Sequence, residues 1–220
     1  MPSPRERLSH LLELAAQGAG ERVHLADEVA DLLLDWPSAY PAAMRGTFEA
    51  LLEKIVGEMA PASCSAIAQR FAGREEVPLA LFNAFFFSAP GAMQEDILAR
   101  NAALGPADGA RIDSDTLLSA VRGSRDCAQT LAEIACVPQA IAQAMLADPT
   151  GRGLAVLARA TGMARASFSA MAILAGPVRS VAENFAMLGV YDAIPENGAR
   201  HLLAAWRTKA EQPAAQIAAA

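Results

Sequence analysis

Apolar residues recur along the chain every three or four positions, which is the spacing of one face of an α-helix. The clearest of these amphipathic stretches are residues 4–17, 21–35 and 41–59. The alternating apolar and polar residues that are typical of β-strands are missing. Alanine, the best helix former, is frequent, and aromatic residues make up only 5% of the chain. The pattern therefore predicts an all-α protein.

Prolines and glycines divide this pattern into short helices. Proline has a fixed φ and lacks an N–H group, which suits the first turn of a helix, and Pro41, Pro78 and Pro138 each precede an apolar run. Thr161-Gly162 and Gly176-Pro177 end such runs. We therefore expect about a dozen helices, the later ones near residues 62–72, 78–88, 91–102, 114–122, 125–136, 138–147, 151–161, 164–175, 178–190 and 195–208.

Helices this short need neighbours for stability, and short connections favour antiparallel hairpins stacked side by side. The expected architecture is thus a HEAT-like or α-solenoid-like array. The loop Gly105-Pro106-Ala107-Asp108-Gly109 is the best boundary, separating a first subdomain at 1–104 from a second at 113–209. Residues 210–220, with a proline and an alanine-rich end, are expected to form a flexible tail.

Several segments together resemble a known bacterial family. They are Ala30–Leu34, Leu131–Ala135, Asp148–Gly151 with Leu154–Gly162, Ser167–Ala170 and Leu202–Arg207. The family is common in alphaproteobacteria, is known as a domain of unknown function and is regarded as all-helical with HEAT-like character. The resemblance implies this fold for the whole chain. It implies no reaction, ligand or catalytic residues.

The net charge of −6 is unevenly distributed. Residues 1–110 carry 8 basic and 15 acidic side chains, whereas residues 111–220 carry 10 basic and 9 acidic ones. Within the acidic half, Glu28, Asp31 and Asp35 lie at i, i+3 and i+7 and share one helix face. These acids suit a protein partner with a basic face, and they make nucleic acid an unlikely partner. We expect the acids to be exposed to solvent.

The apolar runs are shorter than the roughly 20 residues that span a bilayer, and the N-terminus lacks the pattern of a secretion signal. The sequence thus predicts a cytoplasmic protein without a membrane partner. The chain has three cysteines and no CxxC pair, which argues against a disulfide framework or a zinc site. Cys64, Cys127 and Cys136 lie among apolar neighbours, and we expect all three to be buried.

No pattern in the chain indicates a reaction centre. The three histidines lie far apart and lack an HExxH arrangement, and neither a GxSxG nor a GxxxxGK[ST] motif occurs. We therefore expect no catalytic residue, no cofactor and no metal, and favour a non-catalytic scaffold or adaptor that binds other proteins. The alternatives are an enzyme whose site is assembled from distant helices and a helical module that binds nucleic acid.

Two further groups of residues are candidates for interaction. Phe82, Phe85 and Phe86 share a helix face and have the spacing of a core, but Phe87 is rotated by about 100° and would be core or an exposed contact for a partner or a second copy. Arg152, Arg159 and Arg165 are either solvated or gathered at one rim, where they could clamp a carboxylate or phosphate.

The Asp-Pro pair at 148–149 has a structural interpretation. Asp148 is expected to cap the following helix, and Pro149 to occupy its first turn.

Overall fold

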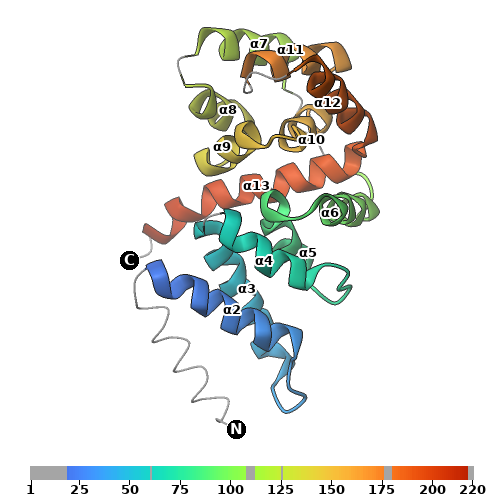
Figure 1. Ribbon diagram of the computed structural model, residues 1–220. Coiled ribbons are helices and arrows are strands. Elements are labelled where there is room, and N and C mark those ends of the chain that lie inside the picture. The colour runs from blue at the N-terminus through green and yellow to red at the C-terminus, as the bar shows by residue number, and fades with distance from the viewer. Residues whose placement is uncertain (1–18, 60, 108–111, 125, 176–179, 218–220) are drawn as a thin grey trace. The chain divides into compact units, whose positions relative to one another are not determined.

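A computed structural model of the chain describes residues 19–59, 61–107, 112–124, 126–175 and 180–217. Within these ranges the chain forms α-helices and one 3₁₀ turn, and no strand is present (Figure 1). The prediction of an all-α protein is confirmed. The helix predicted at residues 4–17 lies outside the described residues. None of the described helices is both long enough and apolar enough to cross a membrane.

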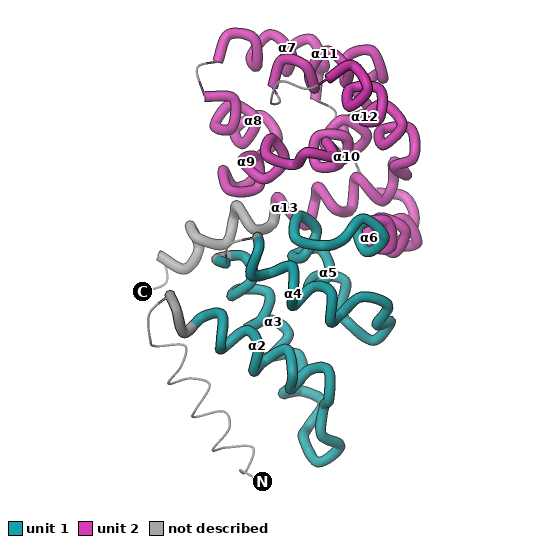
Figure 2. Tube along the Cα trace, viewed as in Figure 1, with its two compact units in different colours: residues 1–94 teal, residues 95–220 magenta. Residues whose placement is uncertain are grey.

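The chain divides into two compact units, residues 1–94 and residues 95–220 (Figure 2). The division falls within helix α6 (Gly91–Ala103), whereas the sequence favoured the later loop at 105–109. Glu95 and the rest of α6 therefore belong to the second unit. Each unit has its own buried core.

The described part of the first unit, from residue 19 on, contains four α-helices besides the start of α6. They are α2 (Ala19–Leu34), α3 (Ala42–Glu58), α4 (Pro61–Phe71) and α5 (Leu79–Ala84), followed by the 3₁₀ turn η1 (Phe86–Ser88). Helix α2 packs on α3 and α4, α3 packs on α5, and α4 packs on η1. Pro41 and Pro78 precede α3 and α5 in extended conformation, and Pro61 is the first residue of α4.

The phenylalanine-rich segment forms the end of this core. Phe82, Phe85 and Phe86 are fully buried, and the ring of Phe85 stacks on that of Phe71 with centroids 5.7 Å apart. The single helix predicted over 78–88 is wrong in one respect, because α5 ends at Ala84 and the chain tightens into η1. The N–H of Ser88 donates to the carbonyl of Phe85, three residues earlier, at 2.8 Å, which is the 3₁₀ pattern.

The second unit gathers around α10 (Arg152–Ala160). Residues 153–158 of this helix are all buried, so it is apolar all round and lies at the centre (Figure 1). It packs on α9 (Gln139–Ala147), α11 (Arg165–Ala175), α12 (Val181–Ala193) and α13 (Glu196–Ile217). The remaining helices are α7 (Ser114–Gly123), which packs on α11, and α8 (Cys127–Ala135), which packs on α7 and α9.

Local side chains fix the ends of these helices. Asp113 caps α7 and Asp126 caps α8. Ser180 and Glu183 form a reciprocal capping box at α12. Helix α10 ends in a Schellman motif, in which the N–H of Gly162, at φ 73°, donates to Arg159 and that of Met163 donates to Ala158.

Two predictions about the ends of helices need correction. Asp148 is the C-cap of α9 rather than the N-cap of α10, a position that Gly151 occupies at φ 68°. The Asp148 carboxylate nevertheless reaches across the loop and accepts from the N–H of Gly153 at 2.9 Å, so it satisfies a free donor in the first turn of α10. Helix α13 continues to Ile217, past its predicted end at 208.

Candidate functional site

The second unit contains an apolar cleft of about 490 Å³. Helices α6, α10 and α12 and the short connection to α13 supply its lining residues: Glu95, Leu98, Ala99, Arg152, Val190, Ala193, Ile194 and Pro195. We call it the Arg152 cleft. A concave, mostly apolar site with a few polar groups is the usual form of a small-molecule site, and its volume lies within the usual range of about 300–1,000 Å³.

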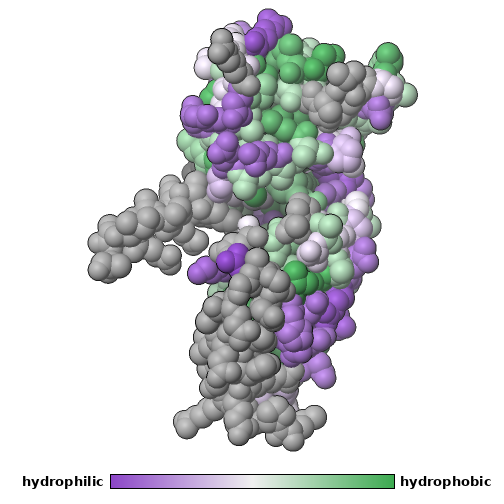
Figure 3. Space-filling model, turned by 60° about the vertical axis from the view of Figure 1, so that its left-hand side comes forward, coloured by the Kyte–Doolittle hydropathy of each residue, from purple (hydrophilic) through white to green (hydrophobic). Residues whose placement is uncertain are grey.

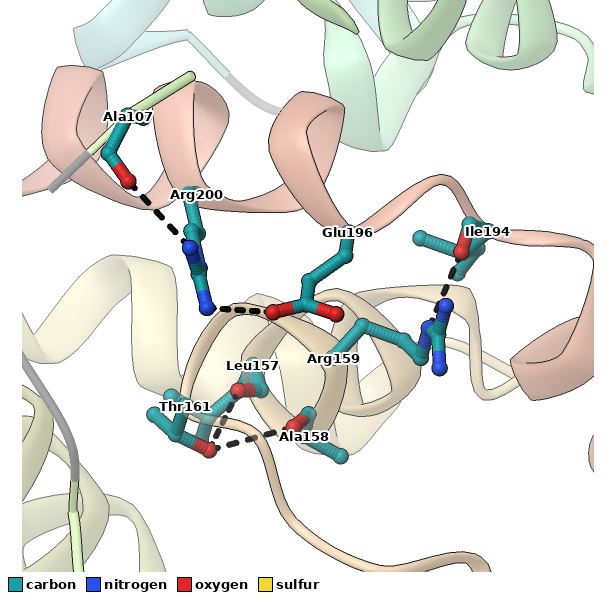
Figure 4. Close-up of polar contacts among 8 residues, drawn as sticks. All are labelled: Ala107, Leu157, Ala158, Arg159, Thr161, Ile194, Glu196 and Arg200. Atoms are coloured by element: carbon teal, nitrogen blue, oxygen red, sulfur yellow. Dashed lines mark hydrogen bonds and ion pairs between the residues drawn. The ribbon is translucent and has the colours of Figure 1, made fainter. Parts of the chain in front are cut away.

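Close helix packing shapes the walls of this cleft. A Cβ atom at Gly198 would lie 2.3 Å from the carbonyl oxygen of Leu98, so only glycine lets α13 approach α6 this closely. A Cβ atom at Gly151 would lie 2.0 Å from Cε of Met187, which is buried in α12. Nε of Arg159 donates to the carbonyl oxygen of Ile194 at 3.0 Å and holds the wall that Ile194 forms (Figure 4).

One ion pair supplies the charge of the Arg152 cleft. Nη2 of Arg152 lies 3.1 Å from Oε1 of Glu95. The Arg152 side chain is only 14% exposed, whereas that of Glu95 is 71% exposed. Arginine stays protonated at any ordinary pH. The cleft therefore has a fixed positive charge whose carboxylate partner is largely in solvent.

A second cleft, of about 680 Å³, is polar and lies where α7 and α13 begin and α10 ends. Its charged residues are Asp113, Glu196 and Arg200. Arg200 pairs with Glu196 and donates from Nη1 to the carbonyl of Ala107, and the hydroxyl of Thr161 donates back to Leu157 and Ala158 (Figure 4). Asp113 accepts from the N–H and hydroxyl of Thr116, which hold the pKa of its carboxyl below the usual value. Each of these polar side chains thus already stabilises a turn or helix end.

Nε of Arg200 is buried and has no hydrogen-bond partner among the described residues. Because it is closed off from solvent, a ligand in the polar cleft could not reach it without rotation of the side chain. The Arg152 cleft, with its apolar walls and exposed carboxylate, is the better candidate for a small ligand.

The second unit also exposes large apolar side chains. Ile173 and Leu174 at the end of α11 are 62% and 40% exposed, and Val181 and Phe185 in the first half of α12 are 72% and 68% exposed. The two helices pack against each other. We call these four residues the α11–α12 surface. The space-filling view shows hydrophobic residues gathered over the second unit (Figure 3).

The three arginines predicted as a cluster each have a partner of their own. Arg152 pairs with Glu95, and Nε of Arg165 lies 3.0 Å from Oδ1 of Asp192. Arg159 bonds to Ile194, and its guanidinium lies 5.2 Å from the ring centroid of Tyr191. Arg159 and Arg165 thus both hold the end of α12. Of the three, Arg152 lines the Arg152 cleft, and an anion site there stays a prediction.

The acidic face of α2 has an internal partner that the sequence did not reveal. Arg70 of α4 pairs with Asp27 at 3.4 Å and with Asp31. Glu28 is half-buried rather than exposed as predicted, because it lies at the edge of the packed face, whereas Asp31 and Asp35 are exposed. Phe87 is half-buried, with its ring edge-on to Phe86 at 5.3 Å.

The prediction of three buried cysteines is wrong for two of them. Cys64 is buried and donates to the carbonyl of Val56, but Cys127 is half-buried and Cys136 is exposed. Cys136 ends α8 in a left-handed conformation at φ 54°, which turns it out of the helix. In the part of the chain that the structure describes, no three His, Cys, Asp or Glu side chains come together in a way that could hold a metal ion.

Sequence reasoning missed Glu95 and the α11–α12 surface. Glu95 could not be found, because it lies 57 residues from Arg152 in the chain. The sequence did contain a signal for the α11–α12 surface. Phe185 lies about 160° around the helix from the buried Met187, so the two large apolar side chains cannot share one face.

Comparisons of the chain with protein-family models, curated proteins and solved structures found no match. The family resemblance therefore stays a prediction based on the sequence segments given above.

Proposed function

We propose that the protein is a non-catalytic interaction module that binds another protein through the α11–α12 surface. The observation that carries the proposal is the exposure of four large apolar side chains on two adjoining helices. Monomeric soluble proteins rarely expose large contiguous apolar patches, and such patches are common at protein interfaces. Val181 and Phe185 lie at i and i+4, so both project from the same face of α12.

The charges on these helices define the kind of partner. Helices α11 and α12 carry only Arg165, Glu183 and Asp192 as charged residues. Arg165 and Asp192 pair with each other, and Glu183 belongs to the capping box. The surface thus offers little charge for a basic partner to recognise, and we propose a partner whose contact face is apolar and poor in charge. A stacked-hairpin architecture fits such a module and is part of the proposal.

Crosslinking in cells tests this function. A photoreactive benzoylphenylalanine replaces Phe185 in the full chain, and the same group at Leu104, which is 60% exposed at the end of α6, serves as the control. The proposal expects one discrete adduct from position 185, none of that mass from position 104, and loss of the adduct when Val181→Ser is added.

Sedimentation of the purified protein identifies self-association. An adduct of twice the chain mass, with a concentration-dependent dimer that Phe185→Ser abolishes, would identify a second copy as the partner. The same crosslinks from positions 104 and 185, or none from 185, would contradict the proposed function.

A further inference from the structure

We propose that the Arg152 cleft binds a small monocarboxylate with an apolar body. This activity is separate from protein binding by the α11–α12 surface. The first argument is the lining of the cleft, in which six of the eight residues are apolar: Leu98, Ala99, Val190, Ala193, Ile194 and Pro195. Apolar walls that are already in place favour an apolar ligand, because little surface has to be reorganised on binding.

The second argument is the guanidinium at the edge of these walls. Arg152 is held by the first turn of α10, the most buried helix of the unit. A guanidinium recognises a carboxylate through two parallel N–H donors. A carboxylate on Arg152 with its hydrocarbon part among Leu98, Val190 and Ile194 would satisfy both properties of the cleft.

The third argument is that Glu95 already shows this recognition. Its carboxylate oxygen lies on Nη2 of Arg152, yet the Glu95 side chain is 71% exposed. A ligand carboxylate that takes the place of Glu95 leaves the Arg152 guanidinium paired with a carboxylate. The Glu95 carboxylate then moves fully into the solvent that already surrounds most of its side chain, so the exchange costs little. Glu95 thus competes with the ligand carboxylate for the guanidinium of Arg152.

The Glu95 carboxylate and the single arginine of the cleft also select against other classes of ligand. A phosphate dianion would meet one arginine and the negative charge of Glu95 at the same edge, and none of the other lining residues in the described part of the chain is basic. An ammonium ligand would be repelled by the positive charge of the buried guanidinium of Arg152. A single negative charge on an apolar body is the best match.

The experiment titrates the full-length ¹⁵N-labelled protein with hexanoate at constant ionic strength and follows amide chemical shifts. The proposal expects saturable shifts of Leu98, Val190 and Ile194, and binding at least about tenfold weaker for hexan-1-ol, which lacks the charge. Arg152→Gln should weaken hexanoate binding at least about tenfold, and Ala99→Trp, at an exposed position on the rim, should block it.

Two further variants separate binding from structure. Glu95→Gln removes the competing charge and should tighten hexanoate binding by about threefold or more, an effect that a purely structural ion pair would not produce. Arg122→Gln removes a positive charge from an exposed position on α7, whose residues are not among those that line the cleft, and should leave binding unchanged.

The proposal is overturned if hexanoate gives no saturable shifts or if hexan-1-ol binds equally well. It is also overturned if Glu95→Gln weakens binding. Should Arg152→Gln fail to fold, Glu95→Gln and Ala99→Trp decide the outcome, since both change exposed positions.

Discussion

Two glycines of the second unit lie within helices but have different surroundings. Gly198 of α13 faces the carbonyl oxygen of Leu98, whereas a Cβ atom at Gly189 of α12 would meet nothing within 4 Å. A backbone atom cannot move aside as a flexible side chain can. The same substitution should therefore have opposite effects at the two positions.

Gly198→Ala should lower the free energy of unfolding of the second unit by about 1–3 kcal/mol, the usual cost of overpacking. Gly189→Ala should raise it by about 0.5–1 kcal/mol, because alanine is the better helix former. Denaturant titration of both variants gives the comparison. Equal effects at the two positions would show that α13 does not approach α6 as closely as described.

The cysteines differ in reactivity for a physical reason. Burial raises the pKa of the Cys64 thiol, an effect that a hydrogen bond with Ser88 only partly offsets. Cys136 is exposed. Since the thiolate is the reactive form, a buried thiol with a raised pKa should react slowly.

At pH 8, iodoacetamide should modify Cys136 at least about tenfold faster than Cys64, as followed by mass spectrometry of the peptides. In denaturing urea the two rates should become similar, because the difference arises from the fold. Equal rates in the native protein would contradict the burial of Cys64.

At the scale of helices, α2 and α4 are joined by a charge contact as well as by apolar packing. Arg70, with 32% of its side chain exposed, lies between Asp27 and Asp31 of α2. Exposed pairs of this kind contribute about 0.2–1 kcal/mol. Asp31, one of the three acids predicted to face a basic partner, is therefore paired within the unit.

Asp31→Lys should lower the free energy of unfolding of the first unit by about 1 kcal/mol, because it replaces an attraction with a repulsion at Arg70. Glu28→Lys, on the same helix but without an ion pair in the described structure, is the matched control and should change it less. Added salt should reduce the difference between the free energies of unfolding of the two variants, since salt screens exposed charges. A difference between the variants that salt leaves unaltered would rule out the electrostatic explanation.

The bounds of helices were largely predictable, because prolines and capping residues act over a few positions. Pro41, Pro78 and Pro138 precede helices in the structure as expected. The departures lie where tertiary packing competes with local preference. At Phe86–Ser88, burial of neighbouring rings accompanies a 3₁₀ turn in place of the predicted α-helix.

The Arg152 cleft could be predicted only in part. Arg152 was a candidate from the sequence, but its partner Glu95 and the approach of Gly198 to Leu98 join segments far apart in the chain. A helical repeat pattern defines which face of a helix is apolar. It does not define which distant helix that face meets, and a cleft between helices depends on that pairing.

At the scale of the whole molecule, the two units each contain one of the chain's two tryptophans. Trp36 lies in the first unit and packs against Tyr40 and Phe48. Trp206 lies in the second and is buried in α13. Units with separate cores can unfold as separate cooperative transitions. The two indole side chains can therefore report on each unit independently.

Single-tryptophan variants test this independence. In Trp36→Phe, fluorescence reports on Trp206, and adding Gly198→Ala should shift its urea midpoint downwards, because the clash lies in the second unit. In Trp206→Phe, fluorescence reports on Trp36, and the same glycine substitution should leave that midpoint unchanged, while Asp31→Lys should lower it. If Gly198→Ala shifted both midpoints equally, the two units would unfold as one cooperative body, and their separate cores would not be separate units of stability.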